Sequence, residues 1–157
     1  MPDDLYRRDF VTWSEVQAER LRRLAAGERV NDVDWENLIE EVETLGRSEL
    51  QAVESLAEQA LIHAMKVAAR PEDPASDHWR GEIRTFLNNA RRRYTPSMKQ
   101  RIDMAAIHAD ALEAVREMAF DGPQRPLREH FALGLNELLS RGFSTADLIA
   151  AVSALDP

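Results

Sequence analysis

Residues 35–69 have the sequence WENLIEEVETLGRSELQAVESLAEQALIHAMKVAA, in which apolar side chains recur at intervals of three and four. This spacing places them on one side of an α-helix and predicts a helix that buries one face along its length. Gly46 is where so long a helix would bend, because glycine costs about 1 kcal/mol relative to alanine within a helix. The apolar positions are Trp35, Leu38, Ile39, Val42, Leu45, Ala52, Val53, Leu56, Ala60, Ala64 and Val67.

Two ionisable residues, Glu49 and His63, fall on the same predicted face. Such groups are costly in a protein core unless they are paired, so they are the main indications of a site. For His63 three interpretations stay open: a core histidine satisfied by a carbonyl or carboxylate, a general base or ligand, or a partly exposed histidine without a role. We expect Glu49 to pair with an arginine of the next helix, Arg84 or Arg91.

The rest of the chain shows further helical periodicity between segments rich in glycine and proline. No segment alternates with period two, so the predicted fold class is all-α. We expect a bundle of five or six helices around residues 35–69, forming one domain over residues 1–157. The other predicted helices cover residues 4–25, 76–94, 98–119, 126–140 and the segment from 145 onward. We expect Ser76 or Asp77 to cap the helix over residues 76–94, and Ser144 with Asp147 to cap the last helix.

Composition excludes several classes of protein. The chain has no cysteine, which rules out disulfide frameworks and thiolate chemistry and suits a reducing compartment. It contains no run of about 18 apolar residues, so no membrane-spanning helix is expected. The N-terminus lacks the charged-then-apolar order of a signal peptide, and a cytoplasmic location is therefore expected. The net charge of −8 opposes non-specific binding to nucleic acid.

The charge is unevenly distributed along the chain. Residues 28–67 carry ten acidic and three basic side chains, whereas residues 79–101 carry seven basic and one acidic. One interpretation is that these segments are neighbouring helices with complementary surfaces. The other is a basic strip that binds phosphate or an acidic partner, with nucleic acid as a weaker alternative. The strip would consist of Arg80, Arg84, Arg91, Arg92 and Arg93.

Several short motifs occur together in a characteristic order. They are Leu5-Tyr6, Asp9-Phe10 and Trp13, then EEVETLGRSE at residues 40–49, His63-Ala64-Met65-Lys66, Trp79-Arg80-x-x-Ile83 and Pro96-Ser97. Over residues 4–120 the chain resembles the DUF29 family of bacterial proteins. The resemblance implies a small cytoplasmic helical protein and brings no catalytic assignment. The family usually has an aromatic residue after the lysine that corresponds to Lys66, where this chain has Val67, and residues 121–157 are expected to form a C-terminal helical extension.

The candidates for chemistry are few. His63 and Lys66 lie three residues apart, and with Glu49, Glu41 and Trp79 they are the candidates for a hydrolase-like or metal-binding pocket. Glu49 would lie about 21 Å along the helix from His63, so each would need partners from other helices. The glutamate-x-x-histidine spacing of di-iron bundles is absent. His78 and Glu82 offer only a weak metal pair, so no metal or cofactor is expected.

The sequence therefore favours a non-enzymatic interaction module of the bacterial cytoplasm. A long amphipathic helix and separated charge suit a protein that presents helical faces to a protein partner or to a second copy of itself. The alternatives are the pocket around His63, Lys66 and Glu49 and, more weakly, nucleic-acid binding through the arginine strip.

Overall fold

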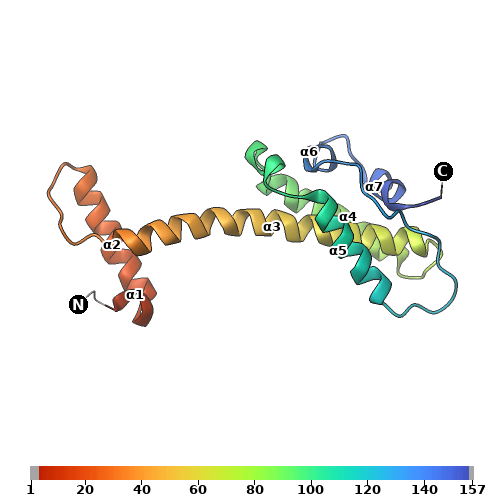
Figure 1. Cartoon of the computed structure of the whole chain (residues 1–157), viewed down its shortest axis with the longest axis horizontal. Coiled ribbons are helices and arrows are strands. Elements are labelled where there is room, and N and C mark those ends of the chain that lie inside the picture. The colour runs from red at the N-terminus through yellow and green to blue at the C-terminus, as the bar shows by residue number, and fades with distance from the viewer. Residues whose placement is uncertain (1–3, 156–157) are drawn as a thin grey trace. The chain divides into compact units, whose positions relative to one another are not determined.

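The structure is a computed structural model that describes residues 4–155. Within these residues it contains helices and no β-strand, which confirms the all-α prediction. The elements are α1 (Leu5–Arg8), α2 (Phe10–Ala25), α3 (Trp35–Ala69), α4 (Ser76–Arg93), the 3-10 helix η1 (Pro96–Gln100), α5 (Met104–Glu117), α6 (Leu135–Leu138) and α7 (Thr145–Val152) (Figure 1). None of the described helices is long and apolar enough to cross a lipid bilayer.

The chain forms two compact units, unit 1 (Met1–Arg47) and unit 2 (Ser48–Pro157). The long helix α3 has the predicted bounds, and it continues through Gly46 as a single α-helix. Its first turns belong to unit 1 and its remaining turns to unit 2.

Unit 1 contains α1, α2 and the beginning of α3. The prediction of one helix over residues 4–25 is wrong at Asp9, where φ is −150° and ψ is 81° and the helix is interrupted. The Asp9 carboxylate accepts hydrogen bonds from the Thr12 amide at 3.0 Å and the Thr12 hydroxyl at 2.7 Å, so it caps the start of α2. Gly27 ends the segment with a φ of +85°, a conformation that glycine adopts without steric cost.

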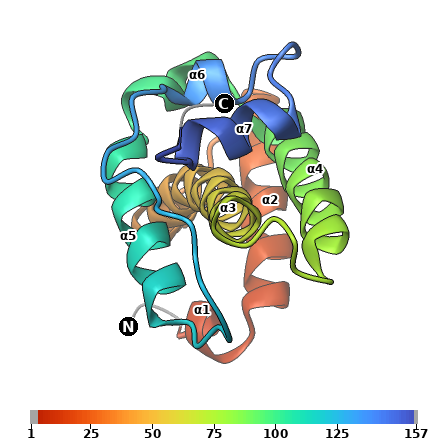
Figure 2. The same cartoon turned by 90° about the vertical axis from the view of Figure 1, so that its right-hand side faces the viewer.

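Unit 2 is built around the second half of α3. Figure 2 looks along α3 and shows α4, α5 and α7 arranged about it. Small side chains of α3 let these helices approach closely: Ala57, Ala60 and Ala64 are fully buried, and Ala68 is 6% exposed. Larger side chains fill the space between the helices, among them Leu61, Met65, Ile83, Leu87, Leu112, Leu135 and Leu148.

Two predicted helix starts differ from those in the structure. Ser76 and Asp77 do not cap α4, since the residue before the helix is Ala75 and no side chain forms a cap there. The helix predicted over residues 98–119 is η1 followed by α5. The Asp103 carboxylate accepts from the amides of Ala105 at 3.0 Å and Ala106 at 3.1 Å, which makes it the cap that sets the first turn of α5.

The helix predicted over residues 126–140 is wrong, because only Leu135–Leu138 are α-helical. The backbone before α6 bonds to other parts of unit 2: the Arg125 amide donates to the Ala69 carbonyl at 2.8 Å, and the Arg128 amide to the Val152 carbonyl at 2.9 Å. Leu127 and Ser153 also form an isolated antiparallel bridge. The helix that follows Ser144 is confirmed, with Ser144 and Asp147 forming the predicted capping box.

Removal of the α5 cap tests the description of its first turn. We expect Asp103→Ala to destabilise the protein by about 1 kcal/mol, because two amides at the helix start lose their acceptor. The measurement is the midpoint of urea unfolding. Asp110→Ala is the matched control, since Asp110 is exposed within α5, and it should leave the midpoint unchanged or raise it slightly. Equal midpoints for Asp103→Ala and the wild type would contradict the capping role.

Candidate functional site

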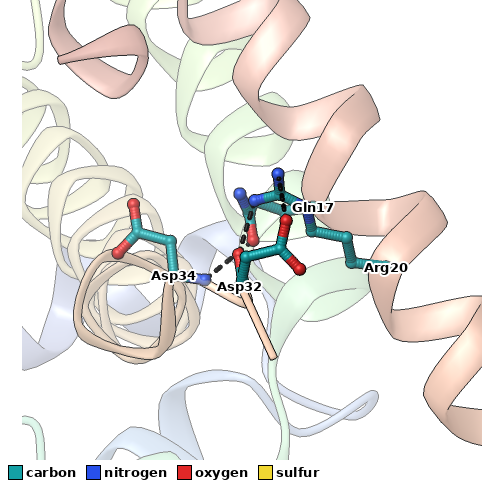
Figure 3. Close-up of polar contacts among 4 residues, drawn as sticks. All are labelled: Gln17, Arg20, Asp32 and Asp34. Atoms are coloured by element: carbon teal, nitrogen blue, oxygen red, sulfur yellow. Dashed lines mark hydrogen bonds and ion pairs between the residues drawn. The ribbon is translucent and has the colours of Figure 1, made fainter. Parts of the chain in front are cut away.

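A polar cluster fixes the beginning of α3 within unit 1 (Figure 3). The side-chain carbonyl of Gln17, a residue that is only 3% exposed, accepts from the backbone amide of Asp34 at 2.9 Å. The Arg20 guanidinium donates to the Asp32 carbonyl and lies 3.0 Å from the Asp32 carboxylate. Two residues of α2 therefore hold the turn that leads into α3.

Asp34 itself joins the two helices. Its carboxylate accepts from the Trp13 indole nitrogen at 2.9 Å and from the Asn37 side-chain amide at 2.7 Å. The pKa of Asp34 is held below its ordinary value, chiefly by the hydrogen bond from Asn37 and to a smaller extent by the hydrogen bond from Trp13. Trp13 is buried and its ring contacts Tyr6 with centroids 4.8 Å apart. The start of α3 is thus fastened to α2 by a buried indole and a carboxylate.

Glu41, one of the catalytic candidates, has a structural partner. The Tyr6 hydroxyl donates to its carboxylate at 2.6 Å. This hydrogen bond, aided by burial and by the nearby carboxylates, raises the pKa of Tyr6 to about 12. The contact ties α1 to α3 within unit 1.

One face of the first turns of α3 is uncovered. Trp35, Ile39, Val42 and Leu45 are 56%, 57%, 67% and 68% exposed, and we call these four residues the exposed stripe. The prediction that the helix buries these positions is wrong. Glu41, which bonds to Tyr6 of α1, lies at least a quarter turn around the helix from Trp35, Ile39 and Val42. The helices of unit 1 therefore pack beside the exposed stripe and leave it open.

His63 and Lys66 lie on α3 opposite α4 in unit 2. The His63 Nδ1 lies 2.8 Å from the Gln59 carbonyl, which can only accept, so Nδ1 carries the proton in the neutral ring. The ring contacts Phe86, and burial lowers the pKa of His63. The Lys66 ammonium lies 4.5 Å from the centre of the Trp79 ring, and burial lowers the pKa of Lys66. Three of the candidates, His63, Lys66 and Trp79, are thus brought together by two helices.

Glu49 is separate from this group. It is exposed, and its carboxylate pairs with Arg93 at 3.1 Å, so the expectation of Arg84 or Arg91 as its partner is wrong. Because α3 is unbroken, Glu49 and His63 lie about 21 Å apart along the helix axis. The structure therefore does not bring Glu49 into a pocket with His63 and Lys66.

The weak metal pair, His78 and Glu82, is an exposed contact between neighbouring turns of α4. His78 Nε2 lies 3.8 Å from the Glu82 carboxylate, and the His78 side chain is 73% exposed. Within residues 4–155 no group of three or more histidine, cysteine, aspartate or glutamate side chains is arranged to hold a metal ion.

The five arginines of the predicted strip have different surroundings. Arg91 donates to the Phe143 carbonyl at 2.6 Å and to the Asn88 side chain at 3.0 Å, which gives it a structural role. Arg93 pairs with Glu49, as described above. Arg92 lines a pocket of about 530 Å³ with Arg93, Ala52 and Leu56, Arg84 is exposed on α4, and Arg80 lines a separate pocket beside α7.

Sequence reasoning overlooked His108 as a buried group. It is 1% exposed, its ring stacks on Phe131 with centroids 5.4 Å apart, and its Nε2 has no hydrogen-bond partner within the described residues. Burial lowers the pKa of His108, with a smaller effect from His130. The spacing of Met104, His108, Ala111 and Val115, all buried, is the signal that identifies this face.

The fold and these sites define an all-α protein with one long helix that carries both an exposed stripe and a buried core segment. The sequence matches Domain of unknown function DUF29 over residues 5–144, and the protein belongs to this family. Its structure is similar to that of an α-helical protein of unknown function from Rhodospirillum rubrum, with 30% identity and a TM-score of 0.70, over 92% of this chain and 95% of the other. No curated protein matches the sequence.

The buried histidine predicts a pH dependence of stability. Folded His108 has a pKa below its ordinary value of 6.5, so the unfolded chain takes up a proton that the folded ring resists. The contribution of His108 to the free energy of unfolding is fully present above pH 6.5. It falls as the pH drops toward the folded pKa, by up to about 1.4 kcal/mol per pH unit for one proton. His63 contributes in the same direction.

The measurement is the urea midpoint between pH 7.5 and pH 5 for the wild type and His108→Phe, which keeps an aromatic ring beside Phe131. We expect the variant to lose less stability on acidification. Gln100→Ala is the control, because Gln100 is exposed and does not ionise, and its profile should follow the wild type. Identical slopes for the wild type and His108→Phe would contradict the assignment.

Proposed function

We propose that the protein is a non-enzymatic interaction module of the bacterial cytoplasm, in which the exposed stripe binds a second copy of the same chain. The observation that carries this proposal is the exposure of four large apolar side chains on one face of a helix: Trp35, Ile39, Val42 and Leu45. Scattered exposed apolar residues are ordinary on protein surfaces, but a contiguous row of them marks an interaction site.

The size of the exposed stripe supports a protein partner. At their exposed fractions the four side chains offer on the order of 300 Å² of apolar surface. A standard interface buries about 800 Å² per partner, with an apolar core and a polar rim. The stripe is large enough for such a core, and Glu36, Glu40, Glu43 and Arg47 beside it are exposed and suit a rim.

Self-complementarity supports a second copy as that partner. A two-fold axis near residues 40–41 would run the two helices antiparallel and place Ile39 of one copy opposite Val42 of the other. The same axis would place the Trp35 indole opposite Gly46. No atom lies within 4 Å of the position that a side chain would take at Gly46, so this site has room for a large ring. The bulky Trp35 end of the stripe and the open position at Gly46 therefore complement each other.

The first test is sedimentation analysis over a range of protein concentrations. We expect the wild type to dimerise, and Val42→Lys to weaken the dimer by at least about tenfold, because a buried charge would replace an apolar contact. Gln51→Lys makes the same change of charge at an exposed position of α3 away from the stripe, and it should associate like the wild type. A wild type that stays monomeric at every concentration would contradict the proposal.

Cysteine crosslinking tests the antiparallel arrangement. The chain has no native cysteine, so single introduced thiols report only on their own position. A mixture of Ile39→Cys and Val42→Cys variants should form crosslinked dimers between the two variants faster than either variant does alone. Crosslinking that is equally fast in each variant by itself would indicate a parallel arrangement and contradict this register.

A further inference from the structure

A pocket in unit 2 combines an apolar floor with two arginines. It has a volume of about 310 Å³ and lies between the end of α3, the side of α4 and the helix α7. Val67, Ile149 and Leu155 are among the apolar residues that line it. Small-molecule sites range from about 300 to 1,000 Å³ and are mostly apolar with a few polar groups, so this pocket suits a small ligand.

The charged groups at the pocket are two arginines, and their guanidinium groups have no partner among the described residues. Neither the Arg80 nor the Arg125 guanidinium makes a hydrogen bond or an ion pair with any group of residues 4–155. The backbone amide of Arg125 donates to the Ala69 carbonyl at 2.8 Å, which holds this residue beside the end of α3. The hydroxyl of Ser153 is already engaged with the backbone of Leu155. Two arginines are therefore left to bind a ligand.

We propose that this pocket binds a small amphipathic anion, with a carboxylate or phosphate head on Arg80 and Arg125 and a short apolar chain on the floor. Arginine presents a planar set of donors that matches both kinds of head group. Arg125 also borders a second pocket of about 380 Å³ that contains Glu72 and Asp121, whose charges disfavour an anion there. The anionic head group is therefore expected in the pocket that Arg80 lines, and not in the second pocket. This site goes beyond the proposed dimerisation and lies in the other unit.

The experiment titrates the full chain with sodium octanoate, with octyl phosphate and with 1-octanol, and follows the backbone amides by NMR. We expect at least one of the anions to bind saturably and to shift amides around Arg80, Arg125 and α7. The uncharged octanol carries the same chain and should not saturate this site. The tighter of the two anions identifies the head group, carboxylate or phosphate, that the site prefers.

The double variant Arg80→Gln with Arg125→Gln should lose at least about tenfold in affinity for the anion, since charge-assisted hydrogen bonds are removed. The double variant Arg84→Gln with Arg101→Gln is the matched control, because both arginines are exposed and their substitution changes the net charge by the same amount. Far-UV circular dichroism establishes that all variants are folded. No saturable binding of either anion, or equal binding by the two double variants, would overturn the proposal. Neither result bears on dimerisation, which sedimentation measures separately.

Discussion

The close packing of helices around the second half of α3 is the constraint on which unit 2 depends. Alanines at positions 57, 60 and 64 have no exposed surface, so the neighbouring helices meet α3 nearly at its backbone. Larger side chains such as Leu61 and Met65 then fill the spaces on either side. In so close a packing an added methylene group has nowhere to go without displacing a helix. The same packing fixes the positions of α4 and α7, and with them the pocket beside Arg80.

Unit 1 is held together differently. Its buried side chains within the described residues are Trp13 and Gln17, and both form hydrogen bonds with Asp34 as well as packing. Directional polar contacts from Trp13, Gln17 and Tyr6 thus fasten α1 and α2 to α3 without covering its apolar face. This is the physical reason that an amphipathic helix keeps its exposed stripe in the structure.

The ionisable residues that the sequence places among the apolar positions of α3 have structural explanations. His63 donates to a carbonyl of its own helix, Lys66 lies over an indole, and Glu49 forms an exposed ion pair with Arg93. Proximity of His63, Lys66 and Trp79 was predictable from their spacing and from the pairing of two amphipathic helices. The partner of Glu49 was not, because three arginines in a row offer several pairings of similar energy on an exposed surface.

Local sequence patterns predict the all-α class, the bounds of α3 and the capping box of α7, because helical periodicity and capping depend on residues three or four apart. Contacts between distant residues set other features of the fold. Residues 125–128 give their backbone hydrogen bonds to Ala69 and to the end of α7, which prevents the helix that their local sequence favours. Tertiary contacts also bury Val53 and leave Val42, on the same helix, exposed. Periodicity reports which face of a helix is apolar, but whether another element covers that face depends on contacts between residues far apart in the chain.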